Sequence, residues 1–238
     1  MQKIIKGVVV MAMAAELAAC KMDQSGYEER ALHMLEEKYD EKFTIWQYAG
    51  REFTRGYFTV ICSPEEAQDI LFETRVANDG SYIEDDYVSA VVCDQAERQI
   101  DENLEYMEGY LLEKVVPVSK SLDSADADMS VEEFMSLKPG NRFAVYLMYC
   151  PQERGADKAY KELQKAFSGL DCMSGNIQLY VMHEEELKEM QGYLAEMTEP
   201  DSGFEERTEG KKRITIPFEK GILQMSDREF AEEAGGVL

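Results

Sequence analysis

An apolar stripe with helical spacing runs through the middle of the chain. After residue 85, apolar residues recur every three or four positions, at Cys93, Ala96, Ile100, Leu104, Met107 and Leu111. That spacing places side chains on one face of an α-helix, and the opposite face carries acidic residues such as Asp94 and Asp101. A stripe of this length must be buried against another layer, so it predicts a long helix within residues 85–115 that covers a sheet.

The segments before this helix supply that sheet. Ser25 to Glu28 has the spacing of a capping box and begins a predicted helix over residues 26–41. Three strands are predicted at 43–49, 56–62 and 69–77, because apolar and polar residues alternate there with a period of two. Residues 25–115 are therefore predicted to form an α-β-β-β-α domain, an antiparallel meander flanked by helices.

The second half alternates strand and helix patterns. Residues 116–128 are rich in Ser and Asp and are predicted to form a linker. A domain over 129–229 follows, with strands at 142–150 and 176–182, a strand pair near 212–225, and helices after 130 and over 156–168 and 183–197. Its alternation predicts a small α/β sandwich, and residues 230–238 are predicted to fray as a C-terminal tail. The fold class predicted for the whole chain is α+β.

Charge excludes one class of partner. The 238 residues contain 25 Lys and Arg against 48 Asp and Glu, a formal charge of −23, with an ordinary 45% of hydrophobic residues. Such a surface repels phosphate backbones, so nucleic acid is not an expected partner. The charge otherwise serves solubility.

The first twenty residues have the order of an export signal. Lys3 and Lys6 make a basic start, Gly7 to Ala15 is an uninterrupted apolar run, and small residues continue to Cys20. The run is shorter than the ~18 apolar residues that span a bilayer. We therefore interpret residues 1–19 as a signal peptide and expect an extracytoplasmic location.

The end of this segment, Leu17-Ala18-Ala19-Cys20, resembles the lipobox of bacterial lipoproteins. The resemblance implies cleavage between Ala19 and Cys20, a lipid on the Cys20 sulfur, and the membrane as a partner through that anchor. Glu16 departs from the usual uncharged pattern. A lipobox before a small acidic body is similar to uncharacterised lipoproteins of Gram-positive bacteria. Four residues separate Cys20 from the predicted first helix, a reach of about 15 Å at ~3.3–3.6 Å per residue.

The other cysteines are not arranged in a recognisable redox or zinc motif. Cys62, Cys93, Cys150 and Cys172 include no C-x-x-C pair. Outside the cytoplasm they allow the bridges Cys62–Cys93 and Cys150–Cys172, but buried free thiols are the favoured interpretation.

Motifs for catalysis or metal binding are likewise missing. His33 and His183 are the only histidines, and no G-x-S-x-G, H-E-x-x-H or Cys–His signature accompanies them. The acidic stretch at Asp126 lacks the glycine and glutamate of a calcium loop. We expect no catalytic residues, no metal and no cofactor.

Two features of the sequence are candidate binding surfaces. Gly210-Lys211-Lys212-Arg213 is the only basic cluster after the signal. It would suit an anionic headgroup or glycopolymer, although such charges more often protect a strand edge. Trp46 and Tyr48 share the parity of one strand, which is typical of core packing more than of a ligand platform.

These observations lead to three hypotheses. The first is a lipid-anchored, non-enzymatic binding or accessory protein of the cell envelope, with an unknown envelope protein or ligand as partner. The second is an envelope hydrolase that uses paired carboxylates. The third is a cytosolic protein whose apolar N-terminus is part of its folded body.

Overall fold

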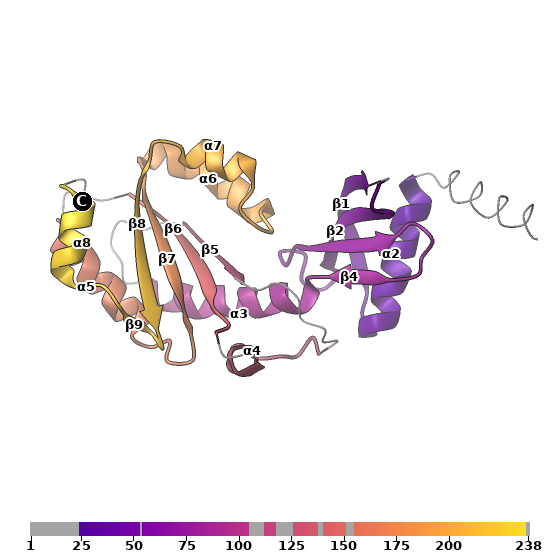
Figure 1. Cartoon of the computed structure of the whole chain (residues 1–238), viewed down its shortest axis with the longest axis horizontal. Helices are drawn as coiled ribbons and strands as arrows, with labels where there is room; N and C mark the ends of the chain where they lie inside the picture. Colours follow the sequence, from indigo (N-terminus) through magenta and orange to yellow (C-terminus); the bar gives the residue numbers. More distant parts are fainter. Residues whose placement is uncertain are drawn as a thin grey trace, which may run out of the picture. The chain divides into compact units, whose positions relative to one another are not determined.

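The computed structural model describes residues 24–52, 54–104, 112–117, 126–137, 140–150 and 155–236. Within them the chain is α+β and forms two compact units, which divide between Tyr87 and Val88. Figure 1 shows each unit as a sheet with helices packed on it. The signal and the lipobox, including Ala19 and Cys20, lie outside the described residues.

Unit 1 is a four-stranded antiparallel sheet with one helix. Its elements are α2 (Gln24–Tyr39), β1 (Phe43–Glu52), β2 (Tyr57–Pro64), β3 (Phe72–Ala77) and β4 (Ile83–Asp85), and the strand order is β1-β2-β3-β4. β1 carries two irregularities in its pairing with β2, after Ile45 and after Tyr48. Bulges of this kind twist an edge strand away from further pairing.

The core of unit 1 follows from the alternation of its strands. Phe58, Val60 and Cys62 of β2 are fully buried, and α2 buries Tyr27, Ala31 and Leu35. Aromatic rings gather at one end of this core, where the Phe43 and Tyr87 rings lie 5.1 Å apart, edge to face. The predicted meander of three strands is confirmed, with β4 as an additional short strand.

Unit 2 is a five-stranded mixed sheet in the order β5-β6-β7-β8-β9. Its strands are β5 (Leu112–Pro117), β6 (Phe143–Tyr149), β7 (Ser174–Val181), β8 (Lys212–Glu219) and β9 (Ile222–Leu223). β6 and β7 are parallel, joined through α5 (Ala156–Phe167), and the other neighbours are antiparallel. The remaining helices are α3 (Tyr87–Leu104), α4 (Val131–Leu137), α6 (Glu184–Glu196), α7 (Ser202–Thr208) and α8 (Asp227–Ala234).

The two faces of this sheet are covered unequally. One face carries Ile177, Leu179, Ile214, Ile216 and Phe218, all buried, and the Phe167 ring of α5 packs on Phe218 with 5.0 Å between ring centroids. The opposite face is covered by α6 and α7 (Figure 1). Beyond these two helices it carries half-buried and exposed polar side chains.

The β5 edge of the sheet is closed by a side chain. The Val115 backbone N–H donates to Glu97 Oε1 at 2.7 Å, and Lys114 Nζ lies 3.3 Å from the same carboxylate oxygen. Burial raises the pKa of Glu97, and the Lys114 charge and the Val115 amide hydrogen bond partly offset this rise. A carboxylate bound to an edge amide removes a donor that another strand would need for pairing.

The predicted long helix is wrong at its C-terminal end. The described part of α3 extends to Leu104, and residues 112–117, which overlap the end of the predicted helix, form the strand β5. Val115 and Val116 are buried in the pairing of β5 with β6, so strand pairing of β-branched residues prevailed over the helical spacing. Met107 and Leu111, the last positions of the stripe, lie outside the described residues.

The predicted domain boundary and tail are corrected as well. Val116 and Pro117 belong to β5 and not to a linker, residues 118–125 lie outside the described range, and the units divide about 30 residues earlier than predicted. Residues 227–234 form α8 with Phe230 and Ala234 fully buried, and the Tyr160 ring of α5 lies 5.5 Å from Phe230. The burial of these two apolar side chains stabilises α8, so the fraying that we predicted from the acidic composition of this segment is wrong for the residues of α8.

None of the helices in the described ranges combines the length and the apolar character that a membrane span requires.

Candidate functional site

The candidate site is a hollow of about 1000 Å³ on the α6–α7 face of the second sheet. We call it the sheet-face groove. Strands β6, β7 and β8 form its floor and α7 forms one wall. It is lined by Tyr146, Gln178, Tyr180, Pro200, Ser202, Phe204, Glu205, Glu206, Thr208, Glu209, Lys211, Arg213 and Thr215.

Strand register builds the floor of the groove. Tyr146, Gln178 and Thr215 are direct partners across β6, β7 and β8, and therefore form one row on the same face. Tyr180 and Arg213 are partners in the next row. Strands lie about 4.8 Å apart, so the polar ends of the two rows fall within roughly 10 Å of one another.

An aromatic side chain fixes the wall onto this floor. Phe204 of α7 is buried between Tyr146 and Tyr180, with ring centroids at 5.2 Å and 5.6 Å and nearly perpendicular planes. Edge-to-face contacts of this kind stabilise more than their buried area alone. The position of α7 therefore depends on the two tyrosines that also line the groove.

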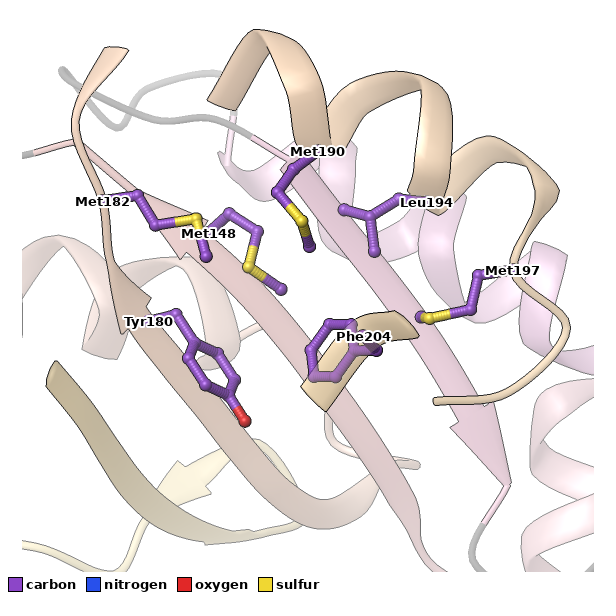
Figure 2. Close-up of a cluster of buried hydrophobic side chains, with 7 residues drawn as sticks. All are labelled: Met148, Tyr180, Met182, Met190, Leu194, Met197 and Phe204. Atoms are coloured by element: carbon purple, nitrogen blue, oxygen red, sulfur yellow. The ribbon is translucent and has the colours of Figure 1, made fainter. Parts of the chain in front are cut away.

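Phe204 belongs to a buried core that is rich in methionine. Figure 2 shows its seven buried side chains, in which α6 and α7 face the strands. We call it the methionine cluster; its members are Met148, Tyr180, Met182, Met190, Leu194, Met197 and Phe204. Unbranched thioether side chains adapt to irregular gaps, which suits the contact between two short helices and a twisted sheet.

The helix α7 is held at its start by a capping carboxylate. Asp201 accepts hydrogen bonds from the Phe204 backbone N–H at 2.9 Å and from the Tyr193 hydroxyl of α6. Both bonds lower the pKa of Asp201, while burial and the same carboxylate raise the pKa of Tyr193 to about 12. The Arg207 guanidinium lies 4.4 Å above the Tyr193 ring, which ties the two helices together.

Several donor groups of the floor face the groove without an acceptor in the described part of the chain. The Thr215 hydroxyl donates to Gln178 Oε1 at 2.9 Å, which leaves the Gln178 amide N–H groups available. Arg213 is exposed and forms no ion pair with a described residue. Burial raises the pKa of Tyr146, with Tyr180 adding to the rise and Arg213 opposing it, so the Tyr146 hydroxyl stays a neutral donor at neutral pH.

The charges around the rim are of both signs. Lys211 pairs with Glu186 at the start of α6, and this contact lowers the pKa of Glu186. Glu205, Glu206 and Glu209 stand exposed on or just after α7. The groove thus has a donor-rich floor and an acidic wall.

Unit 1 contains a second hollow, of about 640 Å³, which we call the acidic depression. It is lined by His33, Glu36, Glu37, Asp40, Glu41, Lys42, Pro64, Glu65 and Glu66. Several of its charges have partners within the unit. Lys42 Nζ lies 2.6 Å from Glu36, and the Tyr87 hydroxyl donates to Glu41 at 2.6 Å. In the described segments, no cluster of three or more His, Cys, Asp or Glu is arranged to hold a metal ion.

The two histidines singled out from the sequence belong to different units, and the aromatic pair Trp46 and Tyr48 belongs to β1. His33 Nδ1 lies 3.4 Å from Glu37 on the exposed side of α2, whereas His183 precedes α6 in unit 2. Trp46 is 53% exposed at an irregularity of β1, and Tyr48 is half-buried. The Trp46 side chain is thus outside the core, contrary to the core packing that we favoured.

The four cysteines of the described chain are free thiols. Cys62 and Cys93 are buried, and Cys150 and Cys172 are half-buried. Burial raises the pKa of Cys62 to about 12, so this thiol is unreactive at neutral pH.

Of the basic cluster singled out from sequence, Lys211 and Arg213 line the groove. β9 pairs only with the end of β8, at Phe218 and Glu219, so Lys212 and Arg213 are at an open strand edge as well. Sequence reasoning missed Tyr146, Gln178, Tyr180 and Thr215. Their alternation within each strand was visible, but only the pairing register brings them into adjacent rows.

Comparisons with known proteins bear on the fold alone. No protein-family model matches this sequence, and no curated protein is similar to it. The chain is similar in structure to a DUF5037 family protein from Ruminococcus gnavus ATCC 29149, with a TM-score of 0.66 and 15% identity over 88% of this chain and 99% of that chain. Because 88% is more than either unit contains, the likeness extends over both.

Proposed function

We propose that this chain is a lipid-anchored, extracytoplasmic binding protein without enzymatic activity, and that the sheet-face groove is its ligand site. The observation that carries the binding role is the donor-rich floor. Polar groups that face a hollow without partners are what a ligand site requires. In the described chain, Arg213, Gln178 and Tyr146 bring such groups together on three neighbouring strands.

The anchor rests on the sequence Leu17-Ala18-Ala19-Cys20. Helix α2 begins at Gln24, four positions after Cys20. A lipid on Cys20 would therefore hold unit 1 close to the bilayer, because four residues reach about 15 Å at most. Stable anchoring requires two or more acyl chains, which the diacylglycerol of a lipoprotein would supply.

Metabolic labelling with a radioactive fatty acid tests the anchor. We expect label on the wild-type chain and none on Cys20→Ala, whereas Cys172→Ala, which removes a half-buried thiol of unit 2, keeps the label. Equal labelling of wild type and Cys20→Ala would overturn the anchor and favour the cytosolic alternative.

Photo-crosslinking in intact cells tests the binding site. A photoreactive amino acid at Thr215, which is exposed in the groove, should form adducts that the same group at Lys161 on the outer side of α5 does not form. Adducts of equal yield from both positions, or none from Thr215, would contradict a ligand site in the groove.

The hydrolase alternative would place its paired carboxylates in the acidic depression. There Glu36 is engaged by Lys42 and Glu41 by the Tyr87 hydroxyl. Carboxylates with structural partners are a poorer basis for acid–base catalysis than free facing ones, so we favour binding.

A further inference from the structure

We infer that the ligand of the sheet-face groove presents a carboxylate, which is bound by Arg213 together with the Gln178 amide and the Tyr146 hydroxyl. This inference rests on the proposed binding role and names the chemistry that the groove recognises. It starts from three side chains of the floor, Arg213, Gln178 and Tyr146, each of which can donate a hydrogen bond to a ligand.

Arg213 is the first element of the argument. Some arginines of this acidic chain are engaged by carboxylates on their own element: Arg98 pairs with Asp94 and Arg228 with Glu232, both at 2.9 Å. Arg213 has none in the described residues, although acids outnumber bases almost twofold. A guanidinium matches a carboxylate with two parallel hydrogen bonds, which a neutral ligand group does not accept as strongly.

Gln178 and the tyrosines supply the remaining donors. The Gln178 oxygen is occupied by the Thr215 hydroxyl, so its amide N–H groups are the part left for a ligand. The Tyr180 ring is fixed against Phe204, and Figure 2 shows its hydroxyl pointing away from the methionine side chains. Tyr180 is the direct cross-strand partner of Arg213, and such pairs have Cβ atoms about 5 Å apart.

The acidic wall limits the charge of the ligand. Glu205, Glu206 and Glu209 border the groove opposite the floor, and the whole chain carries −23. A dianion such as phosphate would be repelled by the wall, whereas a single carboxylate on a neutral or cationic molecule satisfies both sides. A peptide C-terminus and an acidic sugar both have this chemistry.

The test is calorimetric titration of the purified full-length chain with matched probes. One pair is N-acetyl-trialanine and its C-terminal amide, and the other is the single-carboxylate sugar galacturonate and its methyl ester. We expect the acid of one pair to bind at least ~10-fold more tightly than its neutral twin, about 1.4 kcal/mol. The pair that shows the preference identifies the source of the carboxylate.

Two variants assign the preference to Arg213. Arg213→Gln should abolish it, while Lys161→Gln, which removes an exposed charge from α5, should leave it intact. Because Arg213 is exposed, both variants should melt within a degree or two of wild type.

Three results would overturn the inference. The first is that wild type binds the acid and the neutral twin of both pairs equally. The second is that the preference for the acid survives in Arg213→Gln. The third is that inorganic phosphate competes for the groove as well as the acid does. If a ligand binds in the groove without preferring the acid, only the inference of a carboxylate is wrong. If the crosslinking experiment gives no groove-specific adducts, the proposed binding function itself is wrong.

Discussion

The sheet-face groove and the acidic depression both contain many charges, but the charges are engaged differently. In the acidic depression of unit 1, Lys42 pairs with Glu36, and Glu41 accepts from Tyr87. In the sheet-face groove of unit 2, Arg213 and the Gln178 amide have no such partners in the described residues. A high density of charge therefore does not by itself indicate a site. The better sign is a set of convergent groups that the fold leaves unsatisfied.

The hollows also differ in how they are built. The groove depends on α7. This helix is held on the sheet by Phe204, a member of the methionine cluster, whose ring packs between the rings of Tyr146 and Tyr180. The depression is bordered by the C-terminal part of α2 and the ends of β1 and β2. A substitution in α7 should therefore change both stability and ligand binding, whereas one in the depression should change neither by much.

The largest effect is expected for Phe204→Ala. Loss of a buried phenylalanine costs about 3–5 kcal/mol of unfolding free energy, and it would release the wall of the groove. Trp46→Ala, which removes a 53% exposed side chain from β1, should cost less than about 0.5 kcal/mol. Urea denaturation followed by circular dichroism measures both, and similar losses for the two variants would contradict the proposed role of Phe204.

A smaller effect is expected for Asp201→Ala at the start of α7. Removal of a helix-capping side chain costs about 0.5–2 kcal/mol. The pKa of Asp201 is lowered in the folded state, so its stabilising contribution is complete above the ordinary Asp value of about 3.9 and is lost as the pH falls through the lower folded value.

Thermal melts between pH 6 and roughly pH 2.5 should therefore bring wild type and Asp201→Ala closer together as the pH falls. A stability difference that stays constant over that range would show that the carboxylate charge is not what holds α7.

The smallest effect is expected for Glu36→Gln in the acidic depression. The partner of Glu36 is Lys42, whose side chain is 67% exposed, and exposed pairs contribute about 0–1 kcal/mol. Thermal melts should show a shift of at most a few degrees, and groove ligands should bind as they do to wild type. A loss above about 2 kcal/mol would mean that the depression is a built site and not a solvated surface.

The sequence was a good guide where a segment's own pattern decided its structure. Alternation predicted β2 and β3, and helical spacing predicted α2 and most of α3. It failed where partners elsewhere in the chain decided. Val115 and Val116 form part of a strand because they pair with β6. Helix α8 forms because Phe230 packs on Tyr160.

The candidate site was predictable only in part. Lys211 and Arg213 were noticed as a basic cluster because they are adjacent in the sequence. Tyr146 and Gln178 are 32 positions apart, and only the parallel register of β6 and β7 brings them together. That Arg213 faces the groove without an ion pair to a described residue is a property of the fold and cannot be read from residue types.

The most direct test compares one acid probe on three proteins. The full-length wild type, Arg213→Gln and Glu36→Gln are titrated with whichever acid, N-acetyl-trialanine or galacturonate, wild type prefers. We predict that Arg213→Gln weakens the affinity at least ~10-fold and that Glu36→Gln leaves it unchanged. Equal affinity in Arg213→Gln and wild type, or an equal loss in both variants, would contradict the claim that the unpartnered donors of the groove form the binding site.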